Sequence, residues 1–227
     1  MAQQRGSFLK QIFKTNALDM IRKKTKRIPV PSEGMGEGPA QPPDTDKLRT
    51  GLFQIYKEEF KAIQHEPITL LEIGICLGGS MFLWADFFNH NDTQIIGIDL
   101  RIPQVSFPPN VVTYVCDQND TQGLRDVAKR HGPFDIIIDD GSHFSRETRN
   151  SFDILFPHVK VGGYYAIEDW AVGYWKDKAE GYKGMVDVVT DIIRRVPSLS
   201  ISAFKVSLSP HHAFSLFQKG ETGWNGG

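Results

Sequence analysis

The sequence predicts an α/β protein built on a doubly wound, Rossmann-like sheet that is mostly parallel. From residue 45 onward, short runs rich in Ile and Val alternate with longer amphipathic stretches. The runs are apolar almost throughout, as is typical of strands covered by helices on both faces. Each amphipathic stretch is long enough for one crossover helix, and this alternation of strand and helix indicates a parallel sheet.

The elements follow in order along the chain. Helices are expected at Lys47–Gln64, Gly79–Phe88, Thr121–Arg130, Glu147–Phe156 and Asp187–Arg195. Strands of the parallel sheet are expected at Ile68–Ile73, Gln94–Ile98, Val111–Val115, Phe134–Ile138 and Tyr164–Ile167. Two further strands, Ser200–Val206 and His212–Gln218, have no helix between them. They predict an antiparallel hairpin at the C-terminal edge of the sheet.

The N-terminal segment differs in chemistry from the rest of the chain. Residues 1–27 hold eight Lys or Arg and one acid, Asp19, and their apolar side chains recur every three or four positions. A basic amphipathic helix is therefore expected over residues 1–28, packing on the body or on a second subunit of a homo-oligomer. An anionic membrane surface or another polyanion is the alternative contact. Residues 29–44, dominated by Pro and Gly, predict a linker, residues 45–220 the main domain, and residues 221–227 a C-terminal tail.

Composition excludes several classes of protein. Proteins that bind nucleic acids usually present a basic face, and a net charge of -1 does not favour such a partner. The sequence has no run of roughly 18–20 apolar residues, so an integral membrane protein is not expected. The two cysteines, Cys76 and Cys116, lie in or beside apolar runs and predict reduced thiols in a cytoplasmic protein.

Polar and glycine residues follow the first three predicted strands, where parallel sheets bind ligands. Glu72 and Gly74 close the first strand, and Ser80 opens the next helix, whose free amides suit an anionic or polar ligand. Position 76 is Cys and not Gly, so the dinucleotide fingerprint of nicotinamide enzymes is not met. Asp99 ends the second strand, where an acid can bind ribose hydroxyls, and Asp117 and Gln118 follow the third. Together they predict an adenosine-containing ligand.

Acidic residues follow the fourth and fifth strands. Asp140 and His143 come after one, and Glu168 and Asp169 after its neighbour. Adjacent strands lie about 4.8 Å apart, so these side chains can converge, and crowded carboxylates call for a divalent cation. Hard oxygen ligands favour Mg²⁺, with Mn²⁺ or Ca²⁺ as substitutes. Successive strand residues point to opposite sides, so only one of Asp139 and Asp140 readily joins the other acids.

These motifs resemble a known family. Glu72-Ile73-Gly74, Gly78-Gly79-Ser80 and Gly97-Ile98-Asp99 resemble class I S-adenosylmethionine-dependent methyltransferases. The segments from Phe134 to His143 and from Gly162 to Trp170, with Thr45-Asp46-Lys47, resemble the metal-dependent macrolide and sugar O-methyltransferases. That group includes the mycinamicin and macrocin methyltransferases and the cephalosporin hydroxylase-like proteins. A helix containing Tyr56 is similar to one in the family but lacks the histidine often found near it.

The resemblance implies a function and a set of site residues. S-adenosylmethionine would contact Glu72, Gly74, Ser80, Asp99, Asp117 and Gln118, with Asp139 on the cofactor side. Mg²⁺ or Mn²⁺ would be held by Asp140, Glu168 and Asp169. His143 would be the general base, because imidazole can accept a proton at neutral pH. The expected acceptor is a sugar hydroxyl of a small-molecule glycoside, in natural-product or antibiotic biosynthesis.

Two other functions fit parts of the pattern. A catechol-type O-methyltransferase would use the same fold and a metal on an aromatic diol, whose acidic hydroxyls need a histidine base less. A non-catalytic module that binds adenosylmethionine would explain the glycine turn and Asp99 but not the acids. Activity on a glycoside or on a catechol, and the metal dependence of turnover, separate the three.

Overall fold

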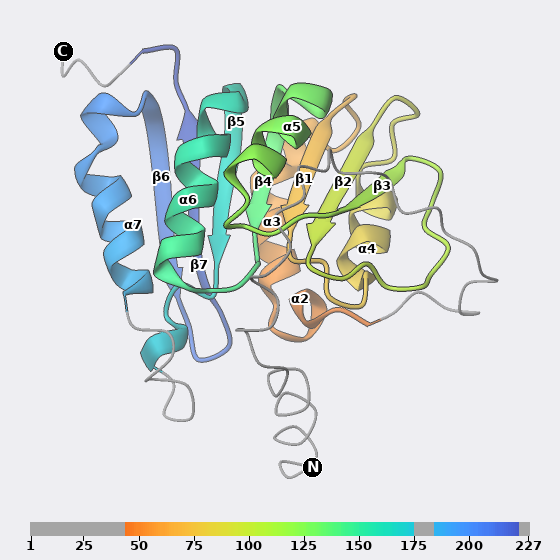
Figure 1. The fold of residues 1–227 in the computed structure, drawn as a ribbon, viewed down its shortest axis with the longest axis horizontal. Coiled ribbons are helices and arrows are strands. Elements are labelled where there is room, and N and C mark those ends of the chain that lie inside the picture. Colours follow the sequence, from red (N-terminus) through yellow and green to blue (C-terminus); the bar gives the residue numbers. More distant parts are fainter. Residues whose placement is uncertain (1–43, 175–183, 223–227) are drawn as a thin grey trace, which may run out of the picture.

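The computed structural model describes residues 44–174 and 184–222. They form one seven-stranded sheet between two layers of helices (Figure 1). The predicted helix over residues 1–28 lies outside the described residues, as do residues 29–43 of the predicted linker and residues 223–227 of the predicted C-terminal tail. None of the helices in the described ranges is long and apolar enough to cross a membrane.

The sheet has the strand order β3-β2-β1-β4-β5-β7-β6. The five parallel strands are β1 (Thr69–Ile73), β2 (Gln94–Asp99), β3 (Val111–Val115), β4 (Phe134–Asp139) and β5 (Val159–Glu168). The strands β6 (Ile201–Leu208) and β7 (Ala213–Lys219) form an antiparallel pair, and β7 lies antiparallel beside β5. The predicted fold class and C-terminal edge hairpin are confirmed. The strand order reverses between β1 and β4, and ligands of such sheets bind beyond the carboxyl ends of the strands at this point.

Helices cover both faces of the sheet. On one face lie α5 (Thr121–His131), α6 (Ser145–Leu155) and α7 (Met185–Arg194), and on the other lie α3 (Leu52–Phe60) and α4 (Gly79–Phe87) (Figure 1). Each layer has its own apolar core against the sheet. Single turns of 3-10 helix lie at Lys61–Ile63, Phe156–His158, Val172–Tyr174 and Val196–Ser198. The strands are therefore apolar on both faces, which explains their continuous apolar sequences.

The single helix predicted over Lys47–Gln64 is wrong. The chain forms a short helix α2 (Asp46–Arg49), then breaks at Gly51, whose φ of 78° is left-handed, and continues as α3 and a 3-10 turn. Glycine adopts this backbone conformation without the steric cost of a side chain. The break places α2 near the carboxyl ends of the strands, next to the start of α3 (Figure 1). Lys47 of α2 is buried there, with only 1% of its surface exposed.

Candidate active site at the carboxyl ends of the strands

Three carboxylates meet where β1, β4 and β5 end. Glu72 lies in β1, Asp140 directly follows β4, and Glu168 ends β5, and one oxygen of each lies within 4.8 Å of the others. Glu72 and Glu168 are buried, whereas Asp140 is partly exposed. Parallel strands bring their carboxyl ends to one edge, which is why residues so far apart in sequence meet. We call Glu72, Asp140 and Glu168 the acid cluster.

The ammonium group of Lys47 lies among these three carboxylates. Its Nζ is 2.6 Å from Asp140 Oδ2, 2.9 Å from Glu168 Oε2 and 3.2 Å from Glu72 Oε1. The contacts to Asp140 and Glu168 are hydrogen bonds, whereas the contact to Glu72 is an ion pair without hydrogen-bond geometry. One cation from α2 therefore holds acids from three strands.

Two aromatic side chains donate to the acid cluster from the helices behind the sheet. The Tyr56 hydroxyl donates to Glu168 Oε1 at 2.7 Å, and the Trp84 indole N–H donates to Glu72 Oε2 at 2.9 Å. The Glu72 Oε1 atom is buried and accepts no hydrogen bond from the described residues. A buried polar atom without a hydrogen bond is uncommon, and it indicates that this side of the cluster can accept a further ligand.

The charges of the acid cluster are unbalanced. Burial, and then the neighbouring Asp140 carboxylate, raise the pKa of Glu168 well above its ordinary value. Burial also raises the pKa of Glu72, against the attraction of Lys47. Burial disfavours the Lys47 ammonium, but Asp140, Glu168 and Glu72 outweigh it and raise the pKa of Lys47 well above its ordinary value. Lys47 therefore stays charged, and the carboxylates remain in excess.

The residues present fit a divalent cation. The donors are hard carboxylate oxygens, which Mg²⁺ prefers, and three carboxylates against one ammonium leave two negative charges in excess when all three are ionised. Asp140 Oδ1 remains free of Lys47, on the partly exposed side of the cluster. The structure thus brings together two of the three predicted metal ligands, Asp140 and Glu168.

The third predicted ligand, Asp169, is not part of the tight group. Its partly exposed carboxyl group interacts with His143, Asp140 and Lys47. Burial raises its pKa, while His143 acts in the opposite direction. Glu72, which is predicted to contact the cofactor, is the third member of the acid cluster.

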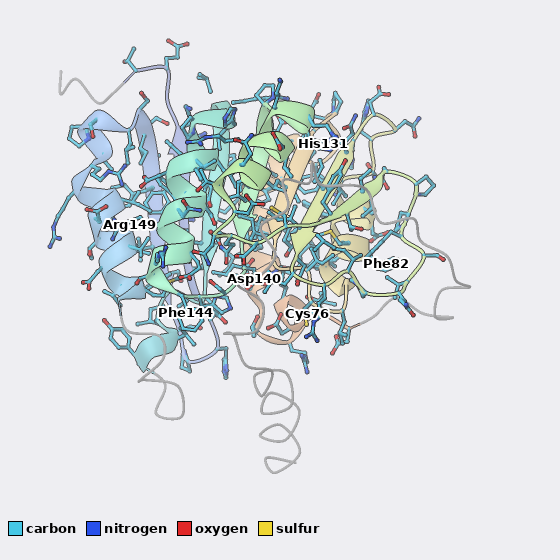
Figure 2. The ribbon with its side chains drawn as sticks, viewed as in Figure 1. Cys76, Phe82, His131, Asp140, Phe144 and Arg149 are labelled. Carbon is cyan, nitrogen blue, oxygen red and sulfur yellow. The ribbon has the colours of Figure 1, made fainter. Side chains whose placement is uncertain are left out.

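His143 lies at the mouth of the acid cluster. Its Nε2 is 3.8 Å from Asp140 Oδ1, and both side chains are about one-fifth exposed. His143, Asp169 and Cys76 have φ values of 55°, 52° and 49° and account for three of the four non-glycine residues with positive φ among those described. Such backbone conformations are costly and concentrate at functional sites. All three follow the ends of central strands; Figure 2 shows Cys76 and Asp140 at the same end of the molecule, with His131 at the other.

Asp139 and Asp140 have different partners, as strand alternation predicts. Asp139 is buried, and its carboxylate accepts hydrogen bonds from Gln118 Nε2 at 2.9 Å and from the Tyr165 hydroxyl at 3.1 Å. Gln118 also donates to Ser151 Oγ at 3.0 Å, so its amide is engaged within the protein. Both residues were predicted to contact the cofactor; in the structure they contact each other and support the turn after β4.

The glycine turn after β1 is held by Asp99. Asp99 Oδ2 accepts hydrogen bonds from the backbone N–H groups of Ile75 and Cys76 at 2.9 and 3.0 Å. Gly74 has a φ of 86°, and a Cβ there would lie 2.1 Å from the backbone oxygen of Asp140. Any side chain at position 74 would therefore separate β1 from the end of β4.

The remaining predicted cofactor residues lie around this turn. Ser80 is buried in the first turn of α4, where its hydroxyl acts to lower the pKa of Glu72 against the effect of burial. Asp117 is exposed and caps its own loop by accepting a hydrogen bond from the Asn119 N–H at 2.8 Å. A cavity of about 680 Å³ opens between α2 and α4, lined by Leu48 and Phe82 among others, but by none of the predicted cofactor residues.

Sequence reasoning missed Lys47 and Trp84 as site residues. Trp84 lies in a mostly apolar helix whose apolar residues are not confined to one face, which gives no signal of a polar role. Lys47 belongs to the Thr45-Asp46-Lys47 segment that carried part of the family resemblance, and this was the one available signal.

The comparisons with known proteins agree with this geometry. A protein-family model described as a methyltransferase domain matches residues 71–170. The sequence is 42% identical to the demethylmacrocin O-methyltransferase of Streptomyces fradiae over 127 residues. This alignment covers 53% of this chain and 32% of the relative. The sequence is 39% identical over 139 residues, 58% of this chain, to the mycinamicin VI 2''-O-methyltransferase of Micromonospora griseorubida, of which it covers 33%.

A solved structure is also similar. The MycE methyltransferase from the mycinamycin biosynthetic pathway, in complex with Mg, SAH and mycinamycin VI, aligns with a TM-score of 0.66 and 29% identity. The alignment covers 83% of this chain and 57% of MycE, and the matched part of this chain spans about a third of the curated relatives. The resemblance that the motifs indicated is therefore confirmed: the chain matches a methyltransferase domain over residues 71–170 and is similar to macrolide and sugar O-methyltransferases.

Proposed function

We propose that this chain is an S-adenosylmethionine-dependent, Mg²⁺-dependent O-methyltransferase that acts on a sugar hydroxyl of a glycosylated natural product. The observation that carries the proposal is the acid cluster at the carboxyl ends of β1, β4 and β5, with His143 beside Asp140. The curated relatives, which are named as methyltransferases of macrolides and glycosylated tetracenomycins, support the choice of acceptor. The similarity to MycE, whose complex holds Mg and SAH, supports the cofactors.

Two groups of residues would hold the cofactors. Asp140, Glu168 and Asp169 would bind Mg²⁺ or Mn²⁺, which when bound orients adjacent sugar hydroxyls and makes them more acidic. The turn at Gly74, Asp99 and the start of α4 would bind S-adenosylmethionine, which supplies the methyl group. Asp99 already holds two amides of this turn, so it fixes the backbone on which the cofactor would lie.

The proton of the acceptor hydroxyl requires a base. His143 lies at the partly exposed side of the acid cluster, where an acceptor can approach. Asp140 Oδ1, 3.8 Å from His143 Nε2, stabilises the imidazolium that forms when His143 takes the proton. Methyl transfer is an in-line displacement, so the rigid turn after β4 also serves to align the acceptor oxygen.

A methyl-transfer assay with labelled S-adenosylmethionine tests the proposed function. The full chain is given a glycoside with free vicinal hydroxyls or a catechol, each in Mg²⁺ and in EDTA. We expect labelling of the glycoside in Mg²⁺ alone. Labelling of the catechol alone would favour the aromatic-diol enzyme. Cofactor binding without labelling of any acceptor would favour a non-catalytic binding module.

We also propose that the protein works in the cytoplasm as a homo-oligomer held by residues 1–28. Cys76 and Cys116 are both free thiols, in keeping with a reducing compartment. Deletion of residues 1–28 should lower the solution mass measured by light scattering and leave cofactor binding intact. An unchanged mass would remove the proposed subunit contact.

A further inference from the structure

Lys47 is more deeply buried than its charge would ordinarily allow. Only 1% of its side chain is exposed, and lysine is almost never fully buried unless it is paired. Its partners come from three different strands, β1, β4 and β5, whereas Lys47 belongs to α2, which precedes the whole sheet. Its ammonium therefore joins four separate elements at one point.

Lys47 contacts one oxygen of each acidic side chain, and the other oxygen of each faces a different group. It contacts Asp140 through Oδ2, while Oδ1 faces His143. It contacts Glu168 through Oε2, while Oε1 accepts from Tyr56. The ammonium thus lies behind the partly exposed face of the cluster and does not fill it.

The net charge of the acid cluster and Lys47 together suits the binding of one further cation. When all three are ionised, Glu72, Asp140 and Glu168 contribute three negative charges and Lys47 one positive charge, which leaves two within the acid cluster; Asp169, outside the cluster, interacts with His143. One divalent cation matches this excess. Without Lys47, three buried carboxylates would face one another, and in the absence of metal they would hold protons or separate.

We propose that Lys47 is a built-in counter-ion that keeps the acid cluster assembled before metal binds and limits the site to one divalent cation. The proposal rests on the metal-dependent function proposed above. Lys47 is a positioning residue in this account: it acts through Asp140 and Glu168 and does not itself touch the acceptor. Its ammonium weakens Mg²⁺ binding because it repels the cation, but it holds the carboxylates in place before Mg²⁺ binds.

The test compares Lys47→Met with the parent chain by thermal unfolding and by calorimetric titration with MgCl₂, both without substrate. Removal of one partner from a buried ion pair is strongly destabilising, so the metal-free melting temperature should fall by about 10 °C. Mg²⁺ should bind about tenfold tighter or more, because a positive charge next to the ion is gone. The rise in melting temperature on addition of Mg²⁺ should therefore be larger in Lys47→Met than in the parent chain. The proposal would be overturned if Lys47→Met lowered the melting temperature equally with and without Mg²⁺ and left the affinity for Mg²⁺ unchanged.

Two further variants make the electrostatic cause specific. Lys160→Met removes an ion pair to Asp135, at the start of β4 and away from the cluster, and should leave Mg²⁺ affinity unchanged. The double variant Lys47→Met/Glu72→Gln restores the parent charge and should return Mg²⁺ affinity toward the parent value. If Lys47→Met does not fold, Glu72→Gln alone should bind Mg²⁺ about tenfold more weakly. Unchanged affinity in Glu72→Gln would contradict the proposal.

The failure of the proposed function has a different signature. If the parent chain binds no Mg²⁺ in the titration, the metal-dependent function is wrong. The counter-ion role is then decided by metal-free unfolding alone: it stands if Lys47→Met melts well below Lys160→Met, and it falls if the two variants melt together.

Discussion

The side-chain oxygen of Gln118 accepts a hydrogen bond from the backbone N–H of Ser142 at 2.8 Å. Gln118 follows β3, whereas Ser142 lies in the turn after β4, and β2 and β1 lie between these two strands in the sheet. Gly141 packs so closely on this amide that a Cβ at position 141 would lie 2.5 Å from Gln118 Oε1. Gln118 therefore fixes the turn that carries Asp140 and His143.

A Gln118→Leu variant should lose turnover and keep cofactor affinity. Leucine has a similar size but leaves the Ser142 N–H without its acceptor and removes one of the hydrogen bonds to the Asp139 carboxylate, which costs about 1–3 kcal/mol of stability and loosens the turn. We expect kcat to fall about tenfold or more, because small displacements of aligned groups are costly. A variant with the parent kcat and weakened S-adenosylmethionine binding would instead assign Gln118 to the cofactor.

Asp139 should make stability fall as pH rises toward neutrality. Burial raises its pKa to about 7, from an ordinary value of 3.8, despite the hydrogen bonds from Tyr165 and Gln118. Because the folded pKa is the higher one, this contribution is fully present below about pH 4 and is lost as pH rises through 7. The loss is about 4 kcal/mol at most.

An Asp139→Asn variant isolates this contribution. The amide is nearly the same shape as the carboxyl group and does not ionise. The free energy of unfolding of Asp139→Asn, relative to that of the parent, should therefore increase as pH rises from 4 to 8. Urea unfolding at several pH values measures the difference. A difference between the two proteins that stays constant over this range would contradict the raised pKa.

The sheet could be predicted because its sequence signal is local. Five apolar runs bounded by glycine and polar residues gave the parallel strands, and two runs without a helix between them gave the hairpin. The break between α2 and α3 could not be predicted, because the periodicity continues across Gly51. β5 begins five residues earlier than expected, because Gly162 and Gly163 interrupt the apolar run from which the strand was predicted. The pairing of β5 with β4 shifts register in this part of the strand.

The site could be predicted where strand order alone decides proximity. Asp140 and Glu168 follow neighbouring strands, so their meeting required only the parallel sheet. The positions of Glu72 and Gln118 depend on which way each side chain turns among its neighbours. Glu72 turns toward Trp84 and Lys47, and Gln118 toward Asp139. Such orientations follow from tertiary packing, which the sequence pattern does not contain.

Asp99→Ala should weaken the binding of S-adenosylmethionine. The change removes the acid predicted to bind ribose and releases the amides of Ile75 and Cys76 that shape the turn. The loss of hydrogen bonds to a charged group costs about 1.5–3 kcal/mol, or about 10–150-fold in Kd. Calorimetric titration measures it. Asp92→Ala, a change at an exposed acid outside the predicted site, provides the control. Equal affinity of the parent and Asp99→Ala would remove Asp99 from the cofactor site.

Glu168→Gln should lower activity in a way that excess Mg²⁺ partly restores. Glutamine keeps the size of the side chain and can still accept from Tyr56, but it removes one negative charge from the acid cluster. Metal affinity is then the property that is lost, and the concentration of Mg²⁺ at half-maximal rate should rise about tenfold or more. A rate that is low at every Mg²⁺ concentration would show that Glu168 has another role.

The pH–rate profile of His143→Ala at saturating Mg²⁺, with an identified glycoside acceptor, tests the central claim most directly. Loss of a general base typically lowers turnover by about 10²–10⁴-fold. Mg²⁺ and S-adenosylmethionine affinity should stay close to the parent values, and His65→Ala, a change at an exposed histidine bonded to Asn89, should behave as the parent. The deficit should shrink as pH rises, because hydroxide then competes as the proton acceptor. A His143→Ala enzyme that keeps the parent rate across neutral pH would contradict the account.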